Sequence, residues 1–407
     1  MNPGPGQPSL QALAAEARSA GKLALDTEFM GEGRYRTLLC LVQVAVPESA
    51  GMAERIELVD PLAPELDGEP LAALLADPAV QVVVHAGRQD IALMRRRFAT
   101  EVRNVFDTQV AAGFVGLGAQ SSYESLLAEL LGIRLSKSAS FTRWDARPLS
   151  PEQLAYARED VVHLLELSSA LERRLAALDR LDWAREECAP LERASDERDP
   201  DVIFSRLPRI RGVSASARPI ARELVRWREQ TAARQDRPAQ SVLSDSALIE
   251  VAKRKPTSVD ELGQIRGVQA ASLRRRGSEL LQAVERGRRL PPEPVPHEAR
   301  RTTPRPEDAA LVALAEALVR ARAREANLAY ELLASRADLH AIVAAGATDH
   351  SRIAGASPND AAGEADVRTL RGWRRELVGQ ELLELLDGRL SLSVLERELQ
   401  IVKRARH

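Results

Sequence analysis

The sequence predicts an α/β domain followed by two all-helical bundles. Within residues 1–200, three β-rich runs with short connections are followed by an apolar run and then by helical patterns. The composition changes twice, at a charged, proline-containing segment near residue 200 and at a proline-rich spacer near residue 290. The helical pattern of residues 206–290 then recurs in weaker form in residues 307–395. We therefore expect three domains with these boundaries.

Composition narrows the class of protein. The chain has 407 residues, of which 44% are hydrophobic and 29% charged, as in soluble globular proteins of two or three domains. No apolar run is long enough to span a bilayer, and the first residues lack the basic and apolar regions of a signal peptide. Two cysteines cannot build a disulfide framework or a cysteine-rich zinc site. We expect a cytoplasmic protein with no membrane partner, and nothing in the sequence indicates an obligate protein partner.

The first domain begins with strands. Four β-rich runs follow one another, at residues 22–30, 37–46, 55–59 and 80–85. The first three have short connections, including a turn at 31–36, which favours an antiparallel meander. A brief helix over 71–75 precedes the fourth run, whose nearly continuous apolar side chains are typical of a parallel strand buried on both faces. A mixed sheet is therefore expected.

The remainder of this domain is predicted to be mostly helical. Ser121 and Ser150 each open a capping box, in which a serine and a Glu or Gln three residues later satisfy the first backbone amides of a helix. The box at Ser121 precedes a short helix over 126–131. The box at Ser150 is the stronger one because Pro151 occupies the first helical position, and we expect its helix to run to about Leu178. The charged residues that follow, 186–202, are interpreted as a linker.

The two bundles are related. In the first of them, helical segments are predicted over 222–228, 247–252 and 270–285, and residues 258–261 are predicted to cap a further short helix before the last of these. A semi-rigid proline-rich spacer follows at 290–296. Residues 224–226 recur as 318–320, and residues 265–268 recur as 370–373. Matching order and spacing favour a diverged duplication over chance helical similarity.

Charge divides the chain. Residues 1–200 carry 21 basic and 31 acidic side chains, whereas residues 206–290 carry 19 basic and 9 acidic ones, and residues 291–407 have a balance of −1. This pattern suggests metal chemistry in the first domain and polyanion binding in the second. The candidate phosphate contacts are Arg226, Arg228, Lys253, Arg254, Lys255, Arg274, Arg275 and Arg276. Each of them is equally well interpreted as part of a solvated helix face.

Two acids on the first strand begin a candidate metal site. Asp26 and Glu28 are two residues apart, so their side chains point to the same side of a strand. Neighbouring carboxylates repel each other unless a cation or a proton lies between them. The spacing alone indicates little, because residues 67–69 repeat it in a loop. Further acids must reach the same place for the pair to be meaningful.

Two such acids follow later in the chain. Asp90 lies just beyond the buried strand, at the start of the next helix, where functional groups of open α/β sheets gather. Asp160 follows Tyr156 by four residues, so the two side chains project from one helical face. Four carboxylates can hold two Mg²⁺ or Mn²⁺ ions roughly 4 Å apart, which serves phosphoryl displacement, and hard oxygen ligands suit these ions better than zinc. His85 lies off this pattern and is interpreted as structural.

These motifs resemble those of a known family. Residues 26–29, Asp90 and Tyr156-x-x-x-Asp160 are similar to the three exonuclease motifs of the DEDD superfamily, tyrosine subclass. The segments 106–109 and 144–149 look like the linking segments of ribonuclease D. The basic unit resembles the helicase-and-RNase-D C-terminal (HRDC) domain, and with its weaker copy it gives the ribonuclease D domain order.

The resemblance implies a fold and an activity. The fold is a ribonuclease H-like exonuclease domain followed by two HRDC-type bundles. The activity is 3′–5′ exoribonuclease hydrolysis with two divalent ions, releasing nucleoside 5′-monophosphates and trimming tRNA precursors and other structured RNAs. Two alternatives remain open: a 3′–5′ DNA exonuclease, because recognition of the 2′-hydroxyl has no readable motif, and a non-catalytic nucleic-acid-binding adaptor.

The resemblance also implies residue roles. Asp26, Glu28 and Asp160 would hold the ion that activates the attacking water, and Asp26 would bridge to a second ion. Asp90 would support that second ion, which stabilises the leaving 3′-oxygen. Tyr156 would orient the water and help to deprotonate it.

Substrate binding follows from the same resemblance and from the charge pattern. Phe29 and Met30 would pack against the terminal base, although core packing explains these two residues nearly as well. The basic bundle would hold the body of a structured RNA. We therefore expect that cutting the chain after residue 205 weakens the binding of structured RNA and leaves the cleavage of short oligomers largely intact.

Overall fold

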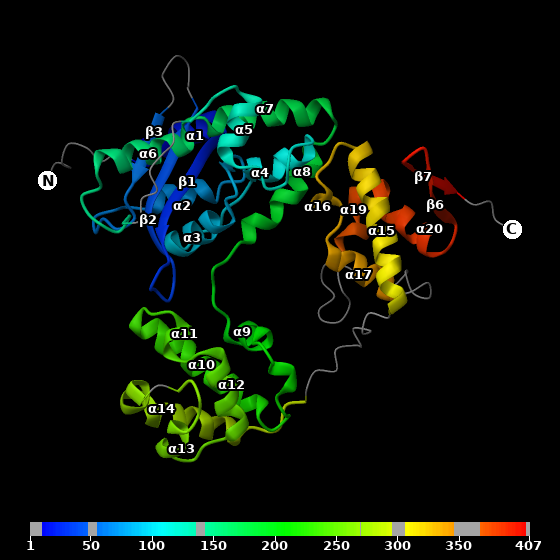
Figure 1. The fold of residues 1–407 in the computed structure, drawn as a ribbon. Coiled ribbons are helices and arrows are strands. Elements are labelled where there is room, and N and C mark those ends of the chain that lie inside the picture. Colours follow the sequence, from blue (N-terminus) through cyan, green and yellow to red (C-terminus); the bar gives the residue numbers. More distant parts are fainter. Residues whose placement is uncertain are drawn as a thin grey trace.

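The computed structural model describes residues 10–47, 55–135, 143–268, 270–294, 306–345 and 367–403. Figure 1 shows a sheet domain, coloured blue to green, with one green helical bundle below it and a yellow-to-red bundle beside it. None of the helices in these ranges is long and apolar enough to cross a membrane.

The first domain is built around a five-stranded mixed sheet with the strand order β3-β2-β1-β4-β5. The strands are β1 (Lys22–Met30), β2 (Leu38–Val46), β3 (Arg55–Val59), β4 (Gln81–Val84) and β5 (Val105–Asp107). The first three form the expected antiparallel meander, and β4 and β5 run parallel to β1. All four residues of β4 are buried, as its apolar run predicts. The sequence analysis did not anticipate β5, because three residues are too few to give a periodic signal.

Helices cover both faces of this sheet (Figure 1). They are α1 (Leu10–Ala20), α2 (Glu69–Leu75), α3 (Arg88–Phe98), α4 (Thr108–Phe114), α5 (Tyr123–Leu130), α6 (Pro151–Val162), α7 (Leu164–Ala177) and α8 (Leu181–Cys188). Alternation along β1 assigns the faces: Leu23 and Leu25 pack with α1, α2 and α3, whereas Ala24 packs with α4, α5 and α7. The central strand β1 is therefore enclosed on both sides.

Two helix predictions need correction. The helix expected to run from Pro151 to about Leu178 is interrupted at His163, whose backbone leaves the helical region at φ −110° and ψ 3°. The interruption lets α6 pack on β1, β2 and β3 while α7 packs on β1 and β4. The residue that caps α5 is Ser122 rather than Ser121, because the Ser122 hydroxyl accepts a hydrogen bond from the Ser125 amide. The capping box at Ser150 forms as predicted.

The segment interpreted as a linker is largely helical. The helix α8 continues to Cys188, a 3₁₀ segment η1 follows over Ala189–Arg193, and α9 spans Pro200–Arg206. The Asp199 side chain caps α9 by accepting a hydrogen bond from the Asp201 amide. The linker was predicted from the charged composition of these residues. Short capped helices with one buried residue per turn are as polar as a linker, so composition does not distinguish the two.

The first bundle has a hydrophobic core of its own. After α9, its elements are a 3₁₀ turn η2 (Ile210–Gly212), α10 (Arg218–Gln235), α11 (Ala239–Val242), α12 (Asp245–Arg254), α13 (Val259–Gly263) and α14 (Ala270–Arg288). The two long helices, α10 and α14, pack along each other. Residues 291–294 of the proline-rich spacer have no regular structure, and residues 295–296 lie outside the described ranges.

The second bundle repeats this order and then adds a hairpin. Its elements are α15 (Pro306–Glu325), α16 (Tyr330–Leu333), α17 (Arg336–Ala345), the 3₁₀ turn η3 (Arg368–Leu370), α19 (Gly372–Arg374), a π-helical turn η4 (Arg375–Gly379), α20 (Gln380–Leu386), β6 (Leu390–Leu395) and β7 (Glu398–Lys403). Each bundle has a long helix, a four-residue helix and a ten-residue helix in the same order. The matched glycines Gly267 and Gly372 both have a positive φ, of 90° and 48°. These correspondences support the duplication, and the hairpin was not anticipated.

The second bundle shares one hydrophobic core with the sheet domain. Phe114 of α4 meets the ring of Trp373 edge-on with ring centroids 5.3 Å apart, and Trp183 of α8 stacks on the same ring at 4.9 Å. In the core of the first bundle, by contrast, Tyr35 is the sole sheet-domain residue before the connecting helices, among the residues that the structure describes.

Candidate active site

The middle strand of the sheet carries the first two acids. Asp26 and Glu28 lie on the same side of β1, and Thr27 lies on the opposite side. The antiparallel register places Gln43 of β2 directly across from Asp26. Gln43 is fully buried, and its amide makes no hydrogen bond to any described residue. The sequence analysis missed this residue, because a single Gln inside an apolar run gives no signal of its own.

The turn after β4 positions Asp90. Ala86 has a positive φ of 52°, and at Gly87 an added Cβ would lie 2.5 Å from the Val84 side chain, so glycine fits this turn better than any larger residue. The Asp107 carboxylate accepts hydrogen bonds from the amides of Ala86 (3.0 Å) and Gly87 (2.9 Å). Asp107 also caps α4. Through Asp107, the segment 106–109 therefore connects the start of α3 to the end of β5.

Asp90 then lies in the first turn of α3 and is 7% exposed. Its carboxylate accepts a hydrogen bond from the hydroxyl of Thr27, the β1 residue between the first two acids. Asp90 is thereby fixed against the strand that carries Asp26 and Glu28.

Tyr156 and Asp160 are both on α6. The Ser150 capping box fixes where this helix starts, and so which side chains face the sheet. Trp144 is buried and lies beside the Tyr156 ring, with centroids 6.0 Å apart. The Arg147 guanidinium donates a hydrogen bond to the Trp144 carbonyl (2.8 Å). The segment 144–149 therefore supports Tyr156 by packing.

Burial and neighbouring charges raise the pKa of each of the four acids. Burial and then the charges of Asp90, Asp160 and Glu28 hold the pKa of Asp26 well above its usual value. Burial, with the charges of Asp160 and Asp90, raises the pKa of Glu28 to about 8. Burial, with the charge of Glu159, raises the pKa of Asp160 to about 7, and burial raises the pKa of Asp90. Carboxylates gathered in this way require protons or cations between them.

Tyr156 is part of the same electrostatic environment. Burial and the charges of Asp160, Glu28 and Asp26 raise the pKa of Tyr156 to about 12. Its hydroxyl therefore keeps its proton near neutral pH and is able to donate a hydrogen bond toward the acids.

The donor set fits hard divalent ions. Its ligating atoms are carboxylate oxygens, with no thiolate or imidazole among the four acids, and such oxygens suit Mg²⁺ or Mn²⁺. In the part of the chain that the structure describes, no three acidic, His or Cys side chains already stand in a metal-coordinating arrangement. The fit rests on the chemistry of the four side chains and on their mutual electrostatic influence.

The remaining candidates near the acids differ in exposure. Phe29 is 39% exposed at the end of β1, whereas Met30 packs against a small cluster that includes Leu41 and Trp144. His85 Nδ1 lies 3.0 Å from the Thr108 hydroxyl, and burial lowers the pKa of His85. Phe29 is thus accessible to a substrate, and Met30 and His85 have packing partners.

Among the candidate phosphate contacts, Arg228 is ruled out by its burial. Its side chain is 2% exposed, and it donates hydrogen bonds to Asp245 at 2.6 Å and to the Leu243 carbonyl at 3.2 Å. The sequence pattern could not separate it from Arg226, which is 41% exposed and pairs with Glu223 and Asp201.

The other basic candidates lie at two places. Lys253, Arg254 and Lys255 lie at the end of α12, where the first two pair loosely with Glu250. Arg274, Arg275 and Arg276 lie in α14. Near the second group the structure places two arginines that the sequence analysis did not select, Arg234 and Arg237. Their positions at the end of α10 and just beyond it gave no pattern in the sequence.

Comparison with known families and proteins agrees with this geometry. Residues 6–176 match the family described as 3′-5′ exonuclease, and residues 218–284 match the family described as HRDC domain. The ribonuclease D of Granulibacter bethesdensis is 37% identical over 97% of this chain and 94% of its own length. That of Gluconacetobacter diazotrophicus is 39% identical over 91% of this chain and 89% of its own.

A solved structure shows the same likeness. The crystal structure of Escherichia coli RNase D, described as an exoribonuclease involved in structured RNA processing, has a TM-score of 0.76 and 28% identity to this chain. The match covers 93% of this chain and 96% of that one. On these likenesses and on the acid-bearing fold described above, the chain belongs to the ribonuclease D family of 3′–5′ exoribonucleases.

Proposed function

We propose that this chain trims the 3′ ends of structured RNAs, tRNA precursors among them, and releases nucleoside 5′-monophosphates. Asp26, Glu28, Asp90 and Asp160 are proposed to hold two divalent ions, Mg²⁺ or Mn²⁺. Bound ions of this kind lower the pKa of a water molecule and stabilise the charge on a leaving oxygen. The observation that carries the proposal is the electrostatic coupling of the four acids on and around β1.

The chain's own residues then have separate tasks. Asp26 and Glu28 are fixed by the central strand, and the hydrogen bond from Thr27 fixes Asp90. Asp160 is presented by α6 together with Tyr156. We assign to Tyr156 the orientation of the attacking water, because α6 carries Tyr156 on the same helical face as Asp160.

Phe29 is proposed to contact the terminal base. A phenylalanine that is 39% exposed beside a polar site offers a stacking surface to an unpaired base. Met30 is left out of this role because its side chain has packing partners.

Matched RNA and DNA oligomers of one sequence, labelled at the 5′ end, test the proposal. With Mg²⁺ the RNA is expected to shorten stepwise from its 3′ end, and chromatography of the products is expected to show nucleoside 5′-monophosphates. Omitting the ion should stop the reaction. Preferential shortening of DNA, release of 3′-monophosphates, or binding of RNA without cleavage would each contradict the proposal.

A further inference from the structure

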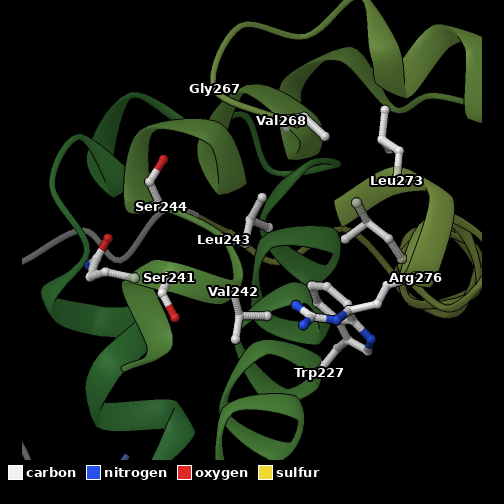
Figure 2. Close-up of a pocket in the computed structure, with 11 residues that line it drawn as sticks. Trp227, Ser241, Val242, Leu243, Ser244, Gly267, Val268, Leu273 and Arg276 are labelled. Carbon is white, nitrogen blue, oxygen red and sulfur yellow. The ribbon is translucent and has the colours of Figure 1, made fainter. Parts of the chain in front are cut away.

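Two cavities in the first bundle lie side by side and share the side chain of Arg276. One has a volume of about 280 Å³ and is lined mainly by uncharged side chains around Trp227 (Figure 2). The other has a volume of about 370 Å³ and a strongly cationic lining, made of Arg234, Gln235, Arg237, Arg275, Arg276 and Glu279. A mostly uncharged cavity that is joined to a cationic one matches a ligand that has a planar ring at one end and a phosphate at the other.

Of the four arginines that line the second cavity, Arg234 pairs with Glu279 and Arg276 donates a hydrogen bond to Gln235. Arg237 and Arg275 make no ion pair or side-chain hydrogen bond to any residue that the structure describes. The one acid in the lining, Glu279, already accepts hydrogen bonds from Arg234 (3.3 Å) and from the Trp227 indole (3.3 Å). Burial and the neighbouring charges of Arg237 and Arg275 lower the pKa of Arg276. Like charges held together in this way favour an anion between them.

The cationic cavity lies next to the catalytic domain. Asp236, the residue before Arg237, accepts hydrogen bonds from the Arg34 guanidinium (2.9 Å) and from the Tyr35 amide (3.2 Å). Arg34 follows Glu28 by six residues, a length of chain that spans at most about 22 Å. An RNA strand that leaves the catalytic acids therefore reaches this cavity within a few nucleotides.

We propose that the two joined cavities bind one nucleotide of the RNA strand upstream of the 3′ end, with its phosphate on Arg237, Arg275 and Arg276 and its base beside Trp227. Guanidinium groups bind phosphate oxygens in pairs, and unstacked bases insert among aromatic and arginine side chains. This inference rests on the proposed function, because it takes the strand to be the substrate. It adds a recognition site away from the catalytic acids.

The first test is the double substitution R237A/R275A in the full-length protein. Both side chains are exposed and without partners among the described residues, so the fold should be preserved, which circular dichroism can check. Binding of a labelled single-stranded RNA is measured without divalent ions, so that no cleavage occurs. The affinity is expected to fall at least about tenfold, and the slope of log affinity against log salt to flatten by about 1.4, or 0.7 for each lost phosphate contact.

The matched control is R206A/R289A, which removes the same charge from exposed positions of the same bundle outside both cavities. It should change affinity little. An equal loss in both variants would mean that the bundle attracts RNA by net charge alone and would overturn the site.

A third variant, Val268→Trp, fills the uncharged cavity without removing a charge. It should weaken binding of the ordinary strand and leave unchanged the binding of a strand of the same length that carries abasic residues upstream of its 3′ end. If both strands are affected equally, or neither is, the base does not occupy this cavity. Tight binding of adenosine 5′-monophosphate with no effect of any variant on strand affinity would make this a mononucleotide site and contradict the proposal.

A dinucleotide separates this inference from the proposed function. It has one phosphodiester, which must lie at the catalytic acids to be cleaved and so cannot also occupy the arginine cavity. Its cleavage by the wild type therefore reports on the catalytic acids alone. Failure of the wild type to cleave any RNA overturns the proposed function, whereas wild-type cleavage combined with undiminished strand binding by R237A/R275A overturns only the inference.

Discussion

The two helical bundles have the same fold and meet the catalytic domain through the same corner, yet the contacts they make there are opposite in kind. In each bundle a residue with positive φ ends the long helix: Asp236 in the first (43°) and Asn327 in the second (48°). Near Asn327, the Ala329 amide donates a hydrogen bond to the Gly113 carbonyl at 3.0 Å, and any side chain at Gly116 would overlap the Asn327 amide. At Asp236 the contacts are exposed hydrogen bonds to the β1–β2 turn.

The interfaces of the two bundles also differ in how deeply their ion pairs are buried. In the second bundle Arg374 is 5% exposed and donates to Glu187 of α8, which also pairs with Arg368 at 3.1 Å. The Arg34–Asp236 pair of the first bundle has side chains that are 34% and 55% exposed. Arg198 of the connecting segment also pairs with the buried Glu229 of α10 (2.7 Å) and lies over the ring of Tyr35 in the β1–β2 turn, 5.2 Å from its centroid.

The two bundles therefore differ in how they are attached to the sheet domain. The second bundle has a near-neutral charge balance and packs on the sheet domain through Trp373. We call the sheet domain and the second bundle together the catalytic body. The first bundle is rich in arginine and has a hydrophobic core of its own, which fits a domain that binds a polyanion. Cutting the chain after residue 205 therefore does not isolate a complete catalytic unit, because it also removes the second bundle and exposes Phe114 and Trp183. For that truncation we therefore also expect a loss of stability of the sheet domain, which the sequence did not indicate.

The largest expected effect lies in the catalytic body. Glu28→Gln keeps the shape of the side chain and removes its charge, so it should lower turnover by about 10⁴-fold or more, the equivalent of the several kcal/mol that a bound ion contributes. Glu69→Gln is the control, since Glu69 has the same Asp-x-Glu spacing and is exposed at the start of α2. Single-turnover cleavage of labelled RNA measures both. Equal rates for Glu28→Gln and wild type would remove Glu28 from the site.

Tyr156→Phe tests the second component of the same site. It preserves the ring beside Trp144 and removes the hydroxyl, so the rate should fall about 10²- to 10⁴-fold with RNA affinity nearly unchanged. Comparing single-turnover rates with binding measured in the absence of divalent ions separates the two quantities. If affinity falls while turnover is preserved, Tyr156 is a packing residue.

Two buried tryptophans compare the bundles directly. Trp373→Ala should lower the free energy of unfolding of the catalytic body by about 3–5 kcal/mol, because it opens a cavity against Phe114 and Trp183. Trp227→Ala should cost the first bundle a similar amount and leave the catalytic body unaffected, since its core is separate. Denaturant unfolding followed by cleavage activity reports on the body in each case. Loss of activity at the same denaturant concentration in both variants would mean that the three domains unfold as one unit.

The smallest effect is expected at the interface charges. Glu187→Ala leaves the buried Arg374 without its carboxylate and should destabilise the catalytic body by about 1–3 kcal/mol. Asp236→Ala breaks an exposed pair and should change stability by less than about 1 kcal/mol. Thermal denaturation of the two variants and of the wild type measures both changes in stability. An Asp236→Ala effect as large as that of Glu187→Ala would contradict the description of the first bundle as a loosely attached arm.

The sequence was sufficient for features that rest on local chemistry. Alternation along β1, the apolar run of β4 and the box at Ser150 all predict the observed elements, because each is written in a few neighbouring residues. It also pointed to the four acids and Tyr156 as candidates, whose roles stay predictions. It could not reveal the role of Asp107, the position of Gln43 opposite Asp26, or the burial of Arg228, since these depend on which distant strands and helices meet. The docking of Trp373 is of the same kind.

Metal-free protein should show a specific pH dependence in the catalytic body. The pKa of Glu28 is about 8 and that of Asp160 about 7, against ordinary values of 4.5 and 3.8. The folded protein therefore holds protons that the unfolded chain releases, so this contribution to stability is complete below about pH 4 and is lost as the pH rises through 7 to 8. The midpoint of thermal unfolding of the body should fall over that range, and less so in Glu28→Gln.

Scanning calorimetry of the full-length protein at pH 8, with and without Mg²⁺, tests the division of labour most directly. Two transitions are expected, one for the catalytic body with its docked second bundle and one for the first bundle. Mg²⁺ should raise the midpoint temperature of the catalytic body's transition and leave that of the first bundle unchanged, because an ion that binds the folded acids stabilises the unit that contains them. Glu28→Gln should remove this shift. A single transition, or a Mg²⁺-dependent shift of the first bundle alone, would contradict this account.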